Sequence, residues 1–330
     1  MTETLLDVRA LNVDYVSPAG AVRACSEVTF QLRRGEILGV AGESGSGKST
    51  LIMALIRLLR PPAVTAGGEV WLHPREGEPV ELVRRSEKQL RALRWRSIAV
   101  VLQSAMDALN PVARLSAQFA DVLKTHDRKM TKERVAERTA ELLGMVGISP
   151  DRARSYPHEM SGGMRQRAMI ALALACDPEL VVMDEPTTAV DVVMQRQILG
   201  HILELRKRLG FSVVFVTHDL SLLMELADRI AIMYGGRIVE VGDSADLYRE
   251  PKHPYTKGLR DSFPPLRAPA TTLHGIPGTP PNLRDLPPGC AFEPRCPRRF
   301  ADCAERTPEL LTVGRGQVAC HLHDRKRAHV

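Results

Sequence analysis

The stretch "EILGVAGESGSGKSTLIMALIRLLR", residues 36–60, decides the fold of this chain. A short apolar run, typical of a buried strand, leads into a glycine-rich turn, and a helical pattern follows until Pro61 and Pro62 stop it. Residues 42–49 fit the phosphate-binding pattern G-x-x-x-x-G-K-[ST], after a strand and at the start of a helix. A glycine-rich turn that binds nothing is the competing interpretation, and the flanking strand and helix argue against it. The stretch therefore predicts binding of a nucleoside triphosphate.

Each residue type in this loop has a chemical reason. Glycines let backbone N–H groups turn toward phosphate oxygens, and the N-terminus of the following helix adds a positive end. Lys48 would neutralise the β- and γ-phosphates, and the Ser49 hydroxyl would bind Mg²⁺. The residues expected to hold the nucleotide here are Gly42, Ser44, Gly45, Ser46, Gly47, Lys48, Ser49 and Thr50.

The rest of the chain alternates strand and helix patterns. Apolar runs that indicate buried strands of a mainly parallel sheet occupy residues 98–103, 180–185, 213–219 and 230–234. The pair Gly235 and Gly236 then predicts a tight hairpin. Residues 110–160 turn helical and polar, which indicates a helical insertion in the α/β core. Residues 263–289 are rich in proline and predict an extended linker.

The composition limits the class of protein. The chain has 330 residues, of which 44% are hydrophobic and 25% charged, and this is ordinary for a globular protein. The net charge of +6 is too mild and too well mixed to predict nucleic-acid binding. The N-terminus lacks a signal-peptide pattern, and the longest apolar runs fall short of the ~18–20 residues of a membrane span. We therefore expect a soluble, cytosolic chain, in which clustered cysteines favour metal or redox chemistry over disulfides.

Two acidic residues end one of the predicted strands. The run "LVVMDE" places Asp184 and Glu185 at its carboxyl end, where they would face the phosphate loop. There Asp184 can hold Mg²⁺ through water, and Glu185 can polarise an attacking water molecule. Alone the pair is a weak signal, because many strands end in an acid that only caps a helix. His218 and Gln103 also end apolar strands, and a purely structural role is the competing interpretation for both.

The stretch "MSGGMRQR", residues 160–167, carries a family resemblance. Ser161, Gly162 and Gly163, with Gln166 and Arg167 after two intervening residues, resemble the signature motif of ABC-type ATPases. In such ATPases two cassettes pack head to tail, and the signature of one closes over the ATP held by the other. A serine and two glycines at a helix N-terminus suit this role, because they form an anion cradle that holds no nucleotide of its own.

The resemblance assigns a role to each remaining motif. It implies three catalytic residues, namely Glu185 as the base, His218 as the switch residue at the γ-phosphate and Gln103 in the Q-loop. It implies a Mg²⁺ site formed by Ser49, Gln103 and, through water, Asp184. Asp191, in "TTAVD", resembles the D-loop aspartate. Tyr15 lies where the family stacks an aromatic ring on adenine, although a plain surface or core tyrosine is the competing interpretation.

Two longer stretches sharpen the resemblance. "SYPHEMSGGMRQRAMIALALACDPELVVMDEPTTAVD" and "PKHPYTKGLRDSFP" resemble the ATPase subunits of oligopeptide and dipeptide importers, and "GESGSGKS" with Met164 resembles their D-type member. The likeness runs from the first residues to Cys320. It departs at Ser104 and Ala105, which replace an acidic-Pro pair, and at Val190, which replaces a leucine. The first departure puts in doubt how the Q-loop region meets the membrane subunits.

The resemblance implies an α/β fold: a P-loop ABC-ATPase core with an antiparallel N-terminal β region and a helical subdomain, plus a small irregular Cys-rich C-terminal domain. We expect the ATPase domain over 1–262 with its helical subdomain at about 104–165, a Pro-rich linker over 263–289 and the Cys-rich domain over 290–330. The implied function is ATP hydrolysis that powers peptide import. Implied partners are an F-type ATPase subunit in a heterodimer, two transmembrane permeases and an extracytoplasmic substrate-binding protein, but no nucleic acid. The implied location is the cytoplasmic face of the membrane, as a peripheral subunit.

A second class of function competes with transport. Some soluble ABC ATPases act on ribosomes or nucleic acid, and one such group carries an iron–sulfur domain. Those proteins resemble tandem cassettes with the cluster domain at the N-terminus, whereas this chain has one cassette and C-terminal cysteines. No basic or aromatic nucleic-acid surface is evident in the sequence.

Four of the six cysteines lie close to the C-terminus, at Cys290, Cys296, Cys303 and Cys320. Their spacing contains no C-x-x-C pair, so structural zinc fits poorly, and a chance grouping of thiols also remains open. Four cysteines on irregular loops suit a [4Fe–4S] cluster, a feature also associated with some peptide importers that resemble this pattern. Neighbouring arginines, Arg295 among them, could offset the cluster's charge. We expect a structural or docking role for this centre, set far from the phosphates by the linker.

Overall fold

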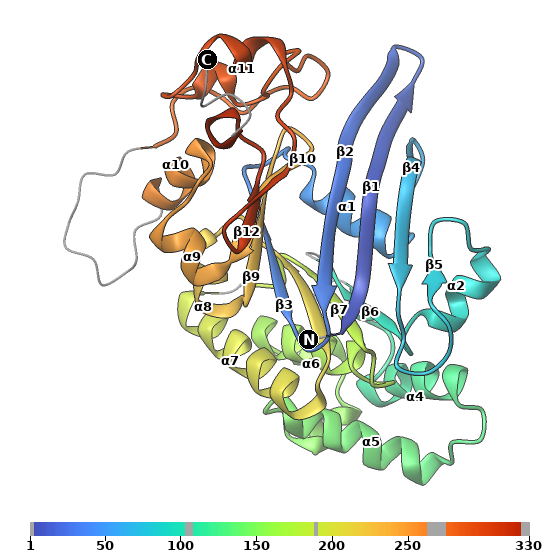
Figure 1. Ribbon diagram of the computed structural model, residues 1–330. Coiled ribbons are helices and arrows are strands. Elements are labelled where there is room, and N and C mark those ends of the chain that lie inside the picture. The colour runs from blue at the N-terminus through green and yellow to red at the C-terminus, as the bar shows by residue number, and fades with distance from the viewer. Residues whose placement is uncertain (1–2, 103–107, 188–190, 263–274, 325–330) are drawn as a thin grey trace.

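The computed structural model describes residues 3–102, 108–187, 191–262 and 275–324. A sheet of eight strands runs through the middle of the molecule, in the order β11-β12-β10-β9-β3-β8-β7-β6 (Figure 1). Its parallel part comprises β3 (Ile37–Ala41), β6 (Ile98–Val101), β7 (Leu180–Asp184), β8 (Ser212–Val216) and β9 (Arg229–Tyr234). β10 (Arg237–Asp243) pairs antiparallel with β9, which confirms the predicted hairpin.

The parallel strands are apolar throughout because both faces of the sheet are covered. In β3, Leu38 and Val40 join the apolar cluster beneath the N-terminal strands, whereas Ile37 and Ala41 join the cluster beneath the helices. Successive side chains of a strand point to opposite faces, so a strand covered on both sides has no polar face. The structure therefore confirms the buried parallel strands that the sequence predicted.

One face of this sheet is covered by elements from the N-terminal part of the chain, between Thr4 and Leu93. An antiparallel sheet of order β2-β1-β4-β5 comprises β1 (Thr4–Ser17), β2 (Gly20–Arg33), β4 (Ala63–Leu72) and β5 (Val80–Glu81). Helices α1 (Lys48–Leu55) and α2 (Glu87–Leu93) belong to the same N-terminal part. α1 is shorter than predicted, because the chain leaves the helix at Ile56 and Arg57 takes a left-handed conformation (φ 57°) well before Pro61.

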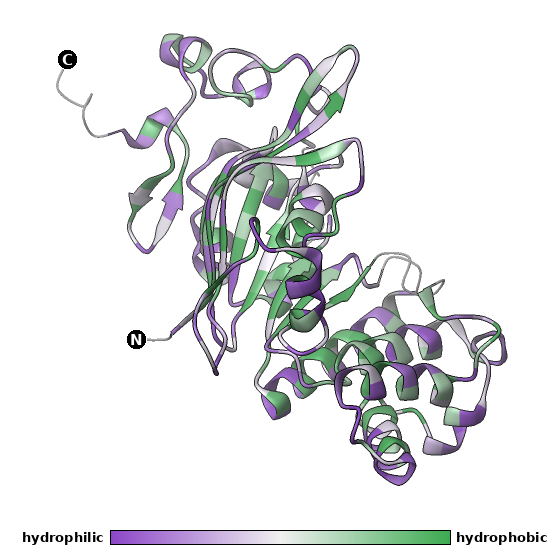
Figure 2. Ribbon diagram, turned by 90° about the vertical axis from the view of Figure 1, so that its right-hand side faces the viewer, coloured by the Kyte–Doolittle hydropathy of each residue, from purple (hydrophilic) through white to green (hydrophobic). Residues whose placement is uncertain are grey.

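The other face is covered by helices. These are α6 (Gly162–Ala173), α7 (Val192–Leu209), α8 (Leu220–Leu226), α9 (Ser244–Arg249) and α10 (Pro254–Ser262). A helical region projects to one side of the sheets, and its ribbons carry both green apolar and purple polar residues (Figure 2). It contains α4 (Leu115–His126), α5 (Lys132–Met145) and two 3₁₀ turns, Pro150–Arg154 and Pro157–Glu159. Among the helices of the described ranges, none is both long enough and apolar enough to cross a bilayer.

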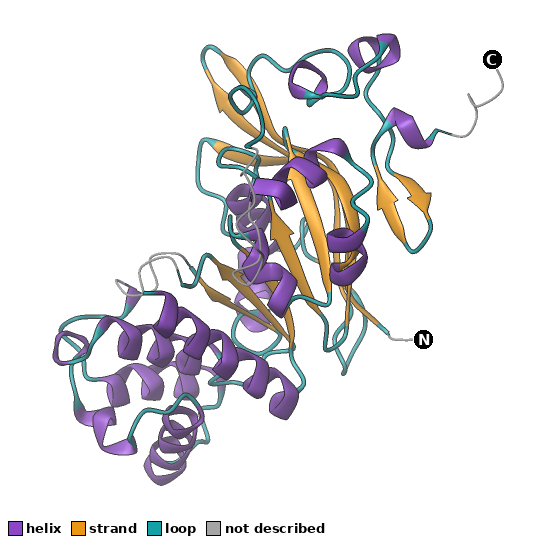
Figure 3. Ribbon diagram, turned by 90° about the vertical axis from the view of Figure 1, so that its left-hand side faces the viewer, coloured by secondary structure: helices purple, strands orange, loops and turns teal. Residues whose placement is uncertain are grey.

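The cysteine-bearing segment rejoins the core. It contains a 3₁₀ turn (Glu293–Arg295), α11 (Ala301–Glu305), β11 (Leu311–Val313), β12 (Gly316–Val318) and a second turn (His321–His323). β12 pairs antiparallel with β10, so the hairpin β11–β12 lengthens the central sheet at its edge (Figure 3). The C-terminal residues are therefore joined to the central sheet by main-chain hydrogen bonds.

Candidate active site

The phosphate-binding loop follows β3 and opens α1, as the sequence predicted. Lys48 Nζ donates hydrogen bonds to the carbonyl oxygens of Gly42 (2.8 Å) and Glu43 (2.9 Å). Lys48 is only 7% exposed, and burial lowers the pKa of its ammonium group, while the nearby carboxylates of Glu185 and Asp184 oppose that shift. The Lys48 ammonium group is therefore buried and bonded only to carbonyl oxygens of its own loop in these two contacts. Phosphate oxygens of a nucleotide can replace those carbonyl oxygens as its hydrogen-bond acceptors.

Two glycines let the loop lie close against the sheet. Gly42 (φ 153°) and Gly47 (φ 101°) both have backbone conformations that favour glycine. A Cβ atom on Gly42 would lie 2.3 Å from the carbonyl oxygen of Met233, and one on Gly47 would lie 2.4 Å from that of Ala24. Both substitutions would therefore force the loop away from the sheet.

The loop has the properties of an anion site. Ser44 and Gly45 are exposed at its tip, so the loop is open to a ligand. The Ser46 hydroxyl is buried and has no hydrogen-bond partner among the described residues. A buried hydroxyl without a partner is costly, and a bound phosphate group would satisfy it. Together with the N-terminus of α1, these residues fit the phosphates of a nucleotide.

Two oxygen donors lie beside the loop. Ser49 Oγ donates to Asp184 Oδ1 at 3.4 Å, and Asp184 ends β7. Burial is the main reason that the pKa of Asp184 is raised, and Glu185 adds to the shift, whereas Ser49 and Lys48 oppose it. A divalent cation would favour the charged carboxylate. Hydroxyl and carboxylate oxygens are the ligands that Mg²⁺ prefers, so this pair fits a Mg²⁺ ion bound together with nucleotide phosphates.

Glu185 and His218 meet at the same edge of the sheet. They follow β7 and β8, which are parallel neighbours, so their carboxyl ends lie side by side. Glu185 takes a positive φ of 43°, and its N–H donates to Val216 O at 2.9 Å. His218 Nδ1 lies 3.1 Å from Glu185 Oε1, and the two side chains are 59% and 17% exposed. The structure thus brings together the acid and the histidine that the sequence singled out.

Tyr15 lies beside the same loop. It belongs to β1, and its hydroxyl is 3.1 Å from Thr50 Oγ1 in α1. The ring is 38% exposed, which leaves part of its surface open to a ligand. A hydrogen bond across 35 residues of sequence places an aromatic ring near the phosphate loop.

The signature motif begins a helix elsewhere on the molecule. Ser161 is the N-cap of α6, preceding Gly162, and its hydroxyl accepts a hydrogen bond from Met164 N (3.3 Å). A Cβ atom on Gly163 would lie 2.7 Å from Met194 Sδ, so α6 packs closely against α7 at this point. Asp191 is the N-cap of α7 and accepts hydrogen bonds from two backbone N–H groups there. Ser161 and Asp191 are thus exposed at the N-termini of α6 and α7, whereas Gly163 is buried.

One residue of the signature stretch connects it to the acidic strand end. Gln166 is 3% exposed, and its side-chain amide donates a hydrogen bond to the carbonyl oxygen of Pro186, directly after Glu185. Gln103, Ser104, Ala105 and Val190 lie outside the described residues.

Sequence reasoning missed three residues at this site. Glu43, the second residue of the phosphate loop, forms a bidentate ion pair with Arg295, and its backbone N–H donates to the Tyr255 hydroxyl at 2.9 Å. The expectation that the linker sets the cysteine segment far from the phosphates is therefore wrong. Arg295 is engaged by Glu43, so its assignment to offset a cluster's charge is wrong as well. The only signals in the sequence were an unexplained acid in an anion-binding loop and an arginine between two cysteines.

The four cysteines lie near one another, but they are not arranged as a formed metal centre. Cys290 N donates to Cys303 O at 2.7 Å, and burial raises the pKa of Cys290 and Cys320 to about 11, with the other cysteines adding to the shift. All four are free thiols. Within the part of the chain that the structure describes, no group of three or more histidine, cysteine or acidic side chains is placed to hold a metal ion. The structure therefore does not show the predicted [4Fe–4S] site.

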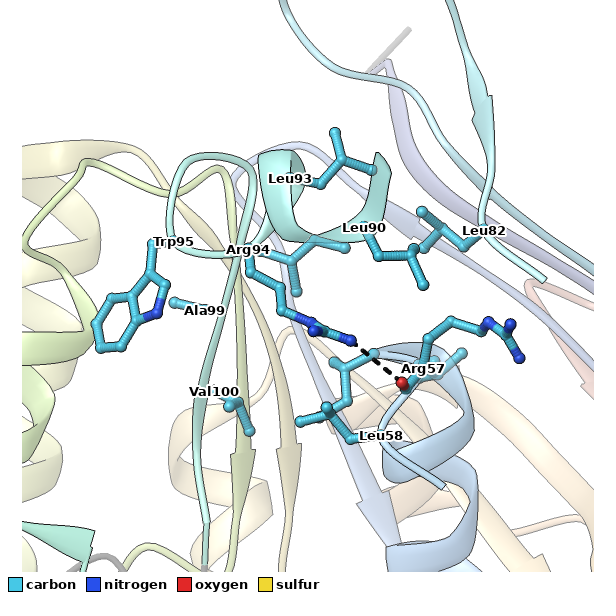
Figure 4. Close-up of a pocket in the computed structure, with 12 residues that line it drawn as sticks. Arg57, Leu58, Leu82, Leu90, Leu93, Arg94, Trp95, Ala99 and Val100 are labelled. Carbon is cyan, nitrogen blue, oxygen red and sulfur yellow. Dashed lines mark hydrogen bonds between the residues drawn. The ribbon is translucent and has the colours of Figure 1, made fainter. Parts of the chain in front are cut away.

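A separate apolar cavity of about 170 Å³ lies between the end of α1, helix α2 and strand β6 (Figure 4). Leucine side chains from α1 and α2 line it, together with Trp95 and the guanidinium group of Arg94. One nitrogen of Arg94 donates to Arg57 O at 3.3 Å, which ties the end of α2 to the end of α1.

Comparison with known proteins identifies the family. The ABC transporter family profile matches residues 25–188, and the profile of the oligopeptide/dipeptide transporter C-terminal region matches residues 239–303. A probable peptide ABC transporter ATP-binding protein of Sinorhizobium fredii is 43% identical over 96% of this chain and 94% of its own length. The dipeptide transport ATP-binding protein DppD of Haemophilus influenzae is 41% identical, with 96% and 95% covered. The oligopeptide transport ATP-binding protein OppD of Escherichia coli is 41% identical, with 95% and 92% covered.

Solved structures agree on the fold. An ABC cassette solved as a dimer with ADP and phosphate has a TM-score of 0.64 and 26% identity, and covers 73% of this chain and 99% of that chain. The cbiO1 cassette of Clostridium perfringens has a TM-score of 0.63 and 25% identity, with 78% and 96% covered. The named relatives are transport subunits, which gives no support to a ribosomal or nucleic-acid role. The chain therefore belongs to the ABC transporter family, as an ATP-binding subunit of the oligopeptide/dipeptide importers.

Proposed function

We propose that this subunit hydrolyses ATP to drive the import of peptides of the dipeptide and oligopeptide class. The observation that carries the proposal is the meeting of Lys48, Asp184 and Glu185 at one end of the sheet, in a chain related to peptide transport subunits. The phosphates of ATP would lie on residues 42–50, with Tyr15 against the adenine ring. Mg²⁺ held by Ser49, Gln103 and water on Asp184 would neutralise charge on the β- and γ-phosphates.

In the chemical step, Glu185 accepts a proton from the attacking water molecule. His218 suits a supporting role, because it lies 3.1 Å from Glu185 and 59% of its side chain remains open toward a γ-phosphate. The positive φ of Glu185 is a strained conformation of the kind that is often found at active sites. Each group thus has a separate role, since Lys48 binds phosphate, Glu185 takes the proton and His218 steadies the transferred group.

A second cassette completes the site. We propose an F-type ATPase subunit as the partner, packed head to tail, so that Ser161, Gly162 and Gly163 close over the ATP held by that partner. Asp191 would lie at the same interface. This arrangement is supported by the exposed N-termini of α6 and α7, which carry backbone N–H groups suited to phosphate. Such a dimer can take a closed and an open state, and ATP hydrolysis can drive the change from one to the other.

The remaining partners are two membrane permeases and an extracytoplasmic substrate-binding protein. We propose that the permeases' cytoplasmic helices bind in the groove beside Gln103 and the helical region 110–160, with this subunit at the cytoplasmic face. The apolar cavity next to β6 supports this location, because it opens near the strand that leads to Gln103 and could receive an apolar side chain (Figure 4).

Affinity purification of the full chain from its native membranes tests the function. Two permeases and a second cassette should co-purify, and the purified complex should hydrolyse ATP faster when the binding protein is loaded with peptide. Co-sedimentation with ribosomes in place of permeases would overturn the proposal, whereas stimulation by a non-peptide ligand would overturn the substrate class alone.

We also propose a division of the chain into an ATPase domain (1–262, with a helical subdomain at about 104–165), a connecting segment (263–289) and a small Cys-rich C-terminal unit (290–330).

We propose that the four cysteines of that unit bind a [4Fe–4S] cluster, with zinc as the alternative. The support is their mutual proximity: Cys290 N donates to Cys303 O at 2.7 Å, and burial, with the neighbouring Cys303 adding to it, raises the pKa of Cys290, Cys296 and Cys320. Binding would draw the thiols together as thiolates and release their protons.

Metal analysis of the purified protein decides whether the four cysteines bind iron, zinc or no metal. The anaerobically purified full chain should be brown, absorb near ~400 nm and contain iron and sulfide. Changing Cys303 to serine should remove the iron, whereas changing Cys176, which lies outside the C-terminal unit, should not. A colourless protein with one equivalent of zinc would decide for zinc, and a metal-free protein would contradict both.

A further inference from the structure

An arginine of the C-terminal segment is buried against the phosphate loop. Arg295 Nη1 and Nη2 donate to the two carboxylate oxygens of Glu43 at 2.7 and 3.0 Å. The Arg295 side chain is only 7% exposed and that of Glu43 is 22% exposed. A bidentate, largely desolvated pair is directional, unlike an exposed surface ion pair. The contact joins residues 252 positions apart and brings the C-terminal segment to the loop that the sequence places far from it.

Aromatic side chains hold Arg295 in this orientation. Its guanidinium carbon lies 5.8 Å from the centre of the Tyr234 ring and 6.0 Å from that of Phe292, and Nη1 donates to the Tyr234 hydroxyl at 3.2 Å. Its Nε donates to Pro277 O at 2.7 Å. The guanidinium group is thus fixed on several sides, and Glu43 is the only acidic group with which it pairs among the described residues.

Glu43 is held at three points. Arg295 holds its carboxylate, the Tyr255 hydroxyl accepts a hydrogen bond from its N–H, and its carbonyl oxygen accepts one from Lys48 Nζ. Two of these three contacts come from residues that follow β9 in the chain. The position of the phosphate loop therefore depends on residues that do not belong to the loop, the acidic strand end or the signature.

We infer that Arg295 is a positioning residue of the nucleotide site, which makes the C-terminal segment part of the ATP-binding machinery. The physical reason is twofold. A carboxylate beside a phosphate cradle repels ATP unless it is neutralised, and the Arg295 pair neutralises Glu43. The same pair fixes the loop in the shape that presents its N–H groups. This inference rests on the proposed nucleotide site at residues 42–50.

The coupling works in both directions. If order in the C-terminal segment improves ATP binding, ATP binding must stabilise that segment by the same factor. Whatever loosens residues 290–296, including a change at the flanking Cys290 and Cys296, would therefore lower the affinity for ATP. This coupling gives the segment a role in the reaction cycle that does not require electron transfer.

The test measures binding of a fluorescent ATP analogue to the full chain. Arg295→Met keeps an apolar stem against the aromatic rings and removes the charge, and it should weaken binding about tenfold, within the usual range of site coupling. Arg299→Met is the matched control, because Arg299 lies in the same segment, is 60% exposed and pairs with Glu293; it should leave binding unchanged. In the assembled complex, Arg295→Met should raise KM for ATP and leave kcat unchanged.

Rescue separates positioning from a general loss of stability. Adding Glu43→Gln to Arg295→Met removes the unneutralised carboxylate and should recover at least part of the lost affinity, which a merely unfolded segment would not. Equal binding by Arg295→Met and the wild type would overturn the inference, and so would a double variant no tighter than the single one. Lys48→Ala should abolish binding in every background; retained binding there would instead overturn the nucleotide site itself.

Discussion

Replacing Glu185 by glutamine should leave ATP bound and almost stop its hydrolysis. The glutamine amide has the size of the carboxylate but cannot accept a proton from water, so the expected loss of turnover is about 10²–10⁴-fold. Binding should persist, because Lys48 and the loop glycines remain in place. Removing a negative charge close to the phosphates should also prolong the ATP-bound state. Phosphate release by the assembled complex measures turnover, and retained radiolabelled ATP measures binding.

Glu225→Gln is the matched control for this experiment. It makes the same chemical change at a side chain that is 65% exposed and lies 3.9 Å from Arg196 in a loose surface ion pair. Its turnover should equal that of the wild type. If Glu185→Gln also hydrolyses ATP near the wild-type rate, Glu185 is not the base, and the 3.1 Å contact with His218 serves only the shape of the strand end.

The parts of the site that the sequence predicted are those fixed by local chemistry. Residues 42–49 carry their own pattern of glycines, lysine and serine. The apolar runs that precede Asp184 and His218 are typical of strands buried on both faces, so the sequence predicts that both residues lie near the ends of such strands. Their meeting at one edge also follows, because neighbouring parallel strands end on the same side. These features can be predicted without knowing which distant residues they contact.

The parts that it missed depend on contacts between distant residues. Nothing near Glu43 indicates that its partner stands at Arg295, because charge complementarity has no period or spacing. The end of α1 was misplaced for a similar reason: Pro61 and Pro62 mark the latest position at which the helix could end, but it ends at Leu55. Arg57 then takes a left-handed conformation, and its carbonyl oxygen accepts a hydrogen bond from the distant Arg94. The proline-rich composition of 263–289 suggested separation, and no composition could show that β12 would pair with β10.

Replacing Phe292 by alanine should cause a large loss of unfolding free energy. The side chain is 2% exposed, and its ring centre lies 5.2 Å from that of Tyr234, 5.3 Å from that of Tyr255 and 5.8 Å from that of His253. Truncating a buried phenylalanine costs about 3–5 kcal/mol of unfolding free energy, through lost burial and the cavity left behind. Urea unfolding of the full chain, followed by far-UV circular dichroism, measures the change.

Phe300→Ala is the matched control, since Phe300 lies in the same segment but is 41% exposed and has an edge contact with His321 at 6.3 Å. Its effect should stay within about 0.5 kcal/mol of unfolding free energy, as is usual for substitutions at the surface.

The shape of the unfolding transition shows whether the C-terminal segment unfolds together with the rest of the chain. If residues 290–324 are integral to the ATPase core, Phe292→Ala should shift one cooperative transition, because the lost ring contacts lie on β9 and α10 as much as on the segment. A separate early transition that leaves the main one in place would show that the segment unfolds alone, and equal effects of the two substitutions would show that it is not packed on the core.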